Sequence, residues 1–261
     1  MSILDRLKLN QKLLVLVLVP LLLVVYFAVS QTLTAWTLRG GAQRLSDLAA
    51  LGVRVSGLVH ELQKERGASA GFLGSRGAKF GSELAAQRQD TDVKQQVLHD
   101  FVSSFDAPAY GGKLQQGLDI VLGELDQIAA KRGLIDRFEL PLGDALAYYT
   151  GMNAKFLGLI SEMSKISPDE RLAIDTAAYA NFLQSKERAG IERAVLANTF
   201  AKDAFGPGLF QRFLGLQTTQ DNYLNVFDSL ASDEHRQLLK DTLQGEAVTE
   251  TLRMRDVATA K

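Results

Sequence analysis

Two arginines in matching sequence contexts are the residues of this chain best suited to binding a small ligand. Arg66 ends a Lys-Glu-Arg triplet at 64–66, and Arg188 ends the same triplet at 186–188. Small residues follow each triplet, where a surface helix would usually place Lys, Glu or Leu. The guanidinium group is always charged, and its planar fork of donors suits planar oxyanions. The pattern indicates that both arginines bind a small oxyanion.

A solvated helix face is the other interpretation of these triplets. Glu65 and Glu187 directly precede the arginines and could form ordinary surface ion pairs with neighbouring bases. The recurrence of the triplet and the small residues beside it favour a ligand site. Gly67 and Gly71 are four positions apart, a spacing that permits close helix packing or leaves a recess next to Arg66. We therefore expect the small residues to make room for a ligand.

Four further residues complete the predicted ligand site, each on weaker grounds than the two arginines. Gly67 and Ser69 belong to the small residues that follow Arg66. Arg193 lies five positions after Arg188, so we expect it to point to another side of the helix. Arg88 lies in the polar segment 85–92, whose side chains could equally pack at a helix interface.

The composition argues against several classes of protein. The 261 residues carry 29 basic and 30 acidic side chains, which gives a net charge of −1 and no support for a nucleic-acid partner. The chain has no cysteine, and its three histidines do not have metal-ligand spacing. Phosphate-binding, dinucleotide-binding and nucleophile-elbow motifs are also missing. We expect a binding module without enzymatic activity or cofactor.

An uncharged apolar segment at 13–29 stands near the start of the chain. Basic residues precede it, and the positive-inside rule then predicts a cytoplasmic segment at 1–12, a single span of the inner membrane at 13–34 in contact with lipid, and a periplasmic remainder. A signal peptide cleaved before Gln31 is the alternative.

Helical spacing of apolar residues continues through 35–250, and no convincing strand pattern occurs. Ser167 is the expected N-cap of the helix that Pro168 and Glu170 begin. Residues 251–261 are the expected start of a C-terminal helix that leads to a missing segment. The fold class is therefore all-α. One helix is expected to run from the membrane segment to about residue 73. The further expected helices cover 80–105, 113–132, 141–165, 167–202, 209–229 and 232–243.

An internal repeat connects the two halves of the chain. Residues 64–73 (KERGASAGFL) resemble 186–196 (KERAGIERAVL), which aligns Arg66 with Arg188. The repeat predicts two helical bundles, each contributing one equivalent arginine.

The segment HELQKERGASAGFLGSRGAKFGSELAAQRQDTD at 60–92 resembles the first half of the nitrate- and nitrite-sensing (NIT) domain, and 186–205 resembles its second half. The resemblance covers about 50–245. It implies two antiparallel four-helix bundles, with nitrate or nitrite held by one arginine of each, Arg66 and Arg188. Such domains are input modules of chemoreceptors, sensor kinases, cyclases and antiterminators.

The expected function follows from the predicted membrane span at 13–34 together with the resemblance to the NIT domain. The chain is predicted to be the sensory part of a membrane-bound signal-transduction protein, such as a methyl-accepting chemotaxis protein, and to form a homodimer. A ligand-free helical scaffold or dimerisation domain at the membrane is the alternative.

Overall fold

The computed structural model describes residues 9–167 and 169–260, in which every regular element is a helix and no strand occurs. It confirms the predicted all-α class. The helices are α1 (Leu9–Gly74), α2 (Gly81–Ser104), the 3₁₀ helix η2 (Ala107–Tyr110), α3 (Gly112–Leu125), α4 (Ile128–Asp136), α5 (Leu142–Ile166), α6 (Glu170–Lys202), α7 (Leu209–Leu230), α8 (Asp233–Thr242) and α9 (Glu246–Thr259).

The chain divides into two units, residues 1–46 and residues 47–261. Residues 1–8 of the predicted cytoplasmic segment lie outside the described part of the chain. Among the described residues, no helix combines the length and the apolar character needed to cross a membrane, so the span predicted at 13–34 is not supported.

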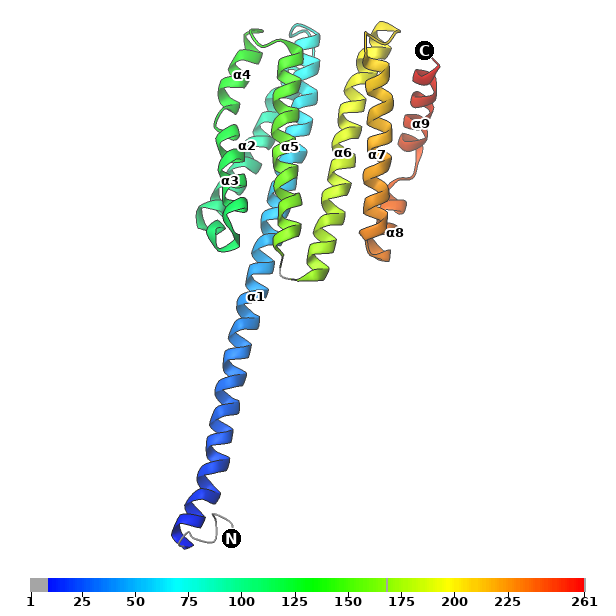
Figure 1. Cartoon of the computed structure of the whole chain (residues 1–261). Helices are drawn as coiled ribbons and strands as arrows, with labels where there is room; N and C mark the ends of the chain where they lie inside the picture. Colours follow the sequence, from blue (N-terminus) through cyan, green and yellow to red (C-terminus); the bar gives the residue numbers. More distant parts are fainter. Residues whose placement is uncertain (1–8, 168, 261) are drawn as a thin grey trace. The chain divides into compact units, whose positions relative to one another are not determined.

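The second unit begins with a bundle made of the C-terminal part of α1, α2, the α3–α4 pair and α5 (Figure 1). Apolar residues of α1 recur every three or four positions and face the core of this bundle. They are Leu48, Leu51, Val55, Leu58 and Leu62, none of them more than 2% exposed. The helical spacing of apolar residues that the sequence predicts is confirmed for this part of α1.

Helices α6 to α9 form the second group, with α6 and α7 side by side and α6 also packed on α5 (Figure 1). Val195 and Leu196 of α6 pack with Phe213 of α7 and Ala258 of α9. Ala180 and Leu183, nearer the start of α6, belong to the core of the first bundle. Because α6 contributes to both cores, a change in its position affects both groups of helices.

Two expected boundaries differ from the structure. The helix expected at 113–132 is broken between Leu125 and Ile128, which are both buried, so the apolar spacing continues through the break and conceals it. The N-cap of α6 is Asp169, whose carboxylate accepts a hydrogen bond from the Leu172 N–H at 2.7 Å, and not Ser167. Pro168 lies outside the described residues.

Candidate functional site

Arg66 projects from α1 toward α6 and is almost fully buried, with 4% of the residue exposed. Its two terminal nitrogens donate to the two carboxylate oxygens of Glu187 on α6, Nη1 to Oε1 and Nη2 to Oε2 at 3.3 Å. Nη1 also donates to Thr150 Oγ1 on α5 at 2.9 Å. Gln63 Nε2 donates to the second oxygen of Glu187 at 2.8 Å. A buried arginine is therefore neutralised by a carboxylate on a neighbouring helix.

Gly190 of α6 lies directly against this ion pair. A Cβ atom at Gly190 would be 3.0 Å from Arg66 Nη2, which is closer than most carbon contacts allow. The small residue next to Arg66 therefore comes from α6, one turn beyond the neighbouring Glu187.

A pocket of about 520 Å³ lies next to Gly190. Its wall beside Arg66 contains Gly190 and Gln63. The pocket is formed by α1, α6 and α9, and both Gln63 and Gly190 line it, so the Arg66–Glu187 pair stands just behind its surface. Its full lining is His60, Gln63 and Lys64 of α1, Lys186, Ala189, Gly190, Glu192, Arg193, Leu196, Ala197 and Phe200 of α6, and Thr251, Met254 and Arg255 of α9.

The polar lining of the pocket is mostly basic. Lys64, Lys186, Arg193 and Arg255 provide positive charge, whereas Glu192 is the one carboxylate among the described lining residues. Basic side chains facing one cavity create a positive potential that attracts anions. The chemistry that this arrangement supports is the binding of a small anion.

Lys186 and His60 meet at the rim of the pocket, where Lys186 Nζ is 3.0 Å from His60 Nδ1. Burial lowers the pKa of Lys186. The pKa of His60 is also lowered, first by burial and then by the charge of Lys186. The neutral imidazole can therefore accept a hydrogen bond from the ammonium group, which leaves the positive charge on the lysine.

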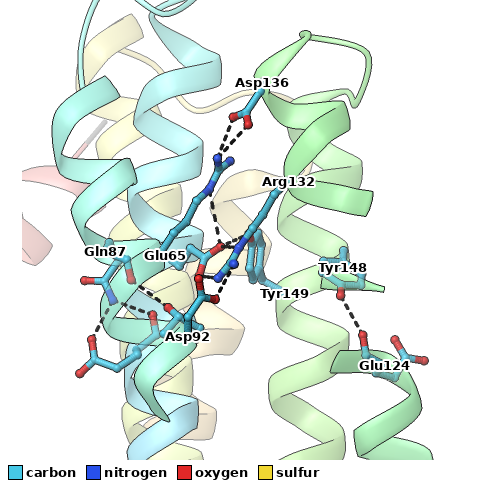
Figure 2. A network of polar contacts seen from close by, with 11 residues as sticks. Glu65, Gln87, Asp92, Glu124, Arg132, Asp136, Tyr148 and Tyr149 are labelled. Carbon is cyan, nitrogen blue, oxygen red and sulfur yellow. Dashed lines mark hydrogen bonds and ion pairs between the residues drawn. The ribbon is translucent and has the colours of Figure 1, made fainter. Parts of the chain in front are cut away.

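A second carboxylate network fills the polar part of the first bundle (Figure 2). Glu65, fully buried on α1, accepts two hydrogen bonds from Arg132 of α4, at 2.7 and 2.9 Å, and one from the Tyr149 hydroxyl at 2.8 Å. Arg132 also donates to Asp92 at 2.6 Å. Neighbouring residues on a helix point about 100° apart, so Glu65 faces the first bundle while Arg66 faces α6.

The second group of helices contains a similar network. Glu192 of α6 accepts two hydrogen bonds from Arg255 of α9, both at 2.7 Å, and one from Gln220 of α7. Hydrogen bonding to Glu192 raises the pKa of Arg255. In both halves, a buried glutamate on the long helix is held bidentately by an arginine of a later helix. The two networks thus relate Glu65 to Glu192, whereas the sequence repeat aligned Glu65 with Glu187.

The other predicted arginines lie in different places. Arg188 donates to Gln184 Oε1 at 2.6 Å, and its guanidinium carbon is 5.1 Å from the centre of the Tyr223 ring on α7. Neither Arg188 nor Arg66 is among the described residues that line this pocket, so the meeting of the two arginines at one cavity stays a prediction. Arg88 bonds to Asp136 at 2.9 Å in the first bundle. Arg193, expected to point away, lines the pocket.

The predicted role of the small residues after Arg66 needs correction. Gly67 is exposed, and a Cβ atom there would meet nothing within 4 Å. A Cβ atom at Gly71 would lie 2.5 Å from the ring of Phe80, so this glycine allows the turn before α2 to pack on α1. Ser69 is buried in the first bundle beside Tyr149. None of the three lines the pocket as described.

Sequence reasoning missed Glu187, Lys186 and Arg255 as members of the site. Glu187 was interpreted as a partner in surface ion pairs, and Lys186 was assigned no role. Arg255 lies in α9, a segment for which the sequence analysis predicted a helix but no part of the site. Within the described chain, no group of three or more histidine, aspartate or glutamate side chains could hold a metal ion.

Comparison with known proteins adds independent observations. The model of the family described as "Nitrate and nitrite sensing" matches residues 57–261, a range that includes every described residue lining the pocket. A protein named nitrate regulatory protein from Klebsiella oxytoca is 28% identical over 216 residues, which are 81% of this chain and 54% of that protein.

A solved structure, titled as that of the NasR transcription antiterminator, superposes with a TM-score of 0.78 at 26% identity. The alignment covers 90% of this chain and 62% of the solved one. This chain therefore spans between half and two thirds of the length of these two relatives.

Proposed function

Because this chain belongs to the nitrate- and nitrite-sensing family, we propose that it is a sensory module that binds nitrate or nitrite in the pocket between α1, α6 and α9. The observation that carries the proposal is the basic lining of that pocket next to the buried Arg66. Arg193 and Arg255 provide planar donor groups, Lys64 and Lys186 provide point charges, and Gly190 lets Arg66 approach the wall.

Nitrate suits these donors on chemical grounds. It is a small planar anion with a single delocalised charge, so removing it from water costs less than removing a phosphate, which concentrates more charge. Arginine forks can bind its oxygens in pairs without a metal. A ligand-free helical scaffold does not require four basic side chains around one cavity, so this lining favours anion binding over the scaffold alternative.

The binding proposal is tested by isothermal titration calorimetry of the full chain with nitrate, nitrite and sulfate. We expect saturable binding of nitrate or nitrite with a stoichiometry of one per chain. Sulfate, a doubly charged tetrahedral anion, should bind more weakly. Absence of heat and of thermal stabilisation with both planar anions would favour the ligand-free scaffold instead.

For the output, we propose regulation of gene expression in preference to the chemotaxis expected from the sequence. The two relatives are named as a nitrate regulatory protein and a transcription antiterminator, and this chain matches only part of each. In this proposal the module passes its ligand state to a further segment or partner through the position of α6. The predicted homodimer is tested by sedimentation with and without nitrate.

The periplasmic location also stays a prediction. A reporter that is active only after export, fused after Lys261, should be active if the location is correct. Activity of a reporter that works only in the cytoplasm would exclude it.

A further inference from the structure

Among the described contacts, Glu187 is the one acidic group that pairs with Arg66. Both terminal nitrogens of the guanidinium bond to Glu187, whose side chain is 2% exposed, and the remaining partner, Thr150, is neutral. A carboxylate and a nitrate are both planar anions that share their charge over equivalent oxygens. Glu187 therefore occupies the same N–H donor edge of the Arg66 guanidinium that a planar anion would use.

The ion pair is next to the proposed anion site. Gly190 and Gln63 both line the pocket, one lying against Arg66 Nη2 and the other donating to Glu187. An anion at this wall is attracted by Arg66 and repelled by Glu187. At a separation of about 5 Å and an effective dielectric constant of about 20, the repulsion corresponds to on the order of 100-fold in a binding constant. In a hydrated pocket with an effective dielectric constant of about 40, the same repulsion corresponds to about tenfold.

We propose that Glu187 is an internal competitor for Arg66, which sets the affinity of the pocket and favours anions that can replace a carboxylate. The inference rests on the proposed function and adds a regulatory residue to it. Since Glu187 is on α6 and Arg66 on α1, an anion that takes over Arg66 loosens the contact between these two helices. The ligand thereby acts on α6, whose residues enter both cores.

The test is Glu187→Gln in the full chain, titrated with nitrate by calorimetry. This change removes the charge and keeps the shape, so we expect nitrate to bind about tenfold or more tightly than to the parent. Without anion the variant should be less stable, and nitrate should raise its melting temperature more than that of the parent. If the ion pair were only structural, Glu187→Gln would lower both the stability of the fold and its affinity for nitrate.

The matched control is Glu65→Gln. Glu65 is also a fully buried carboxylate bound to an arginine, but it faces Arg132 in the first bundle and does not line the pocket. Its replacement should not tighten nitrate binding. If Glu187→Gln fails to fold, Glu187→Met provides the second variant, because it also removes the charge at a similar side-chain length, and nitrate should again bind more tightly.

The outcomes separate the two proposals. Tighter binding by a Glu187 variant and not by Glu65→Gln supports the competitor role. Unchanged or weaker binding by a folded Glu187 variant, with the parent still binding nitrate, overturns the competitor role and leaves the proposed function standing. Absence of nitrate and nitrite binding in the parent and in the variants overturns both.

Discussion

Replacing Arg66 by alanine should destabilise the fold strongly, because it leaves Glu187 buried without its counter-ion. The side chains of the pair are 5% and 2% exposed, and only the neutral amide of Gln63 would still bond to the carboxylate among the described contacts. Removing one partner of a buried pair costs about 3–5 kcal/mol. For a unit of this size each kcal/mol lowers the melting temperature by about 2–4 °C, so the expected loss is about 6–20 °C.

The measurement is urea unfolding followed by circular dichroism, with Arg253→Ala as the control. Arg253 pairs with Glu250, but these side chains are 63% and 46% exposed, so the control should leave the free energy of unfolding nearly unchanged. The double variant Arg66→Ala/Glu187→Gln should recover at least about 1 kcal/mol, because the buried charge is gone. If Arg66→Ala is as mild as Arg253→Ala, or the double variant recovers nothing, the burial argument is refuted.

Three further predictions concern the pocket, the glycines and pH. Arg193→Ala and Arg255→Ala remove cations from the pocket lining and should weaken nitrate binding about tenfold or more in calorimetry. Arg188→Ala and Arg88→Ala should change the nitrate affinity less than about threefold. The opposite ranking would support the site expected from the sequence. In urea unfolding, Gly67→Ala should stabilise the fold by up to about 1 kcal/mol, because the position is helical and open. Gly71→Ala should destabilise the fold, because the added Cβ atom would overlap the Phe80 ring. Equal effects of the two changes would show that packing at Phe80 is unimportant. Burial and the charge of Lys186 lower the pKa of His60 below its ordinary value of 6.5, so the contribution of the neutral imidazole to stability is full above about pH 6.5 and is lost as the pH falls through the folded-state pKa. His60→Gln should flatten this part of the plot of unfolding free energy against pH. An unchanged plot would exclude His60 as the source of the pH dependence.

The sequence predicted the helices well because the burial of α1 follows a regular spacing. Leu51, Val55, Leu58 and Leu62 all occupy one face, as the pattern required. The break between α3 and α4 was missed because Leu125 and Ile128 keep the same spacing across it. The segment 246–259 forms α9 although its apolar pattern is weak.

The ligand role of the predicted site residues stays a prediction. Arg66, singled out from the sequence, is buried and bound to Glu187, whereas a Cβ atom at Gly67 would meet nothing within 4 Å. The second triplet was also relevant, but Glu187 and Lys186, and not Arg188, face α1 and the pocket. Adjacent helical side chains point about 100° apart, and a sequence without known helix packing does not specify which of them faces the neighbour.

The account depends most on where the anion binds, and a crystal structure of the full chain grown with nitrate tests this directly. We predict one planar, three-lobed density in the pocket between α1, α6 and α9, within hydrogen-bonding distance of Arg193 or Arg255 and next to Arg66. Nitrate bound instead beside Arg188 and Tyr223, or in the Glu65–Arg132 network of the first bundle, with the pocket empty, would contradict it.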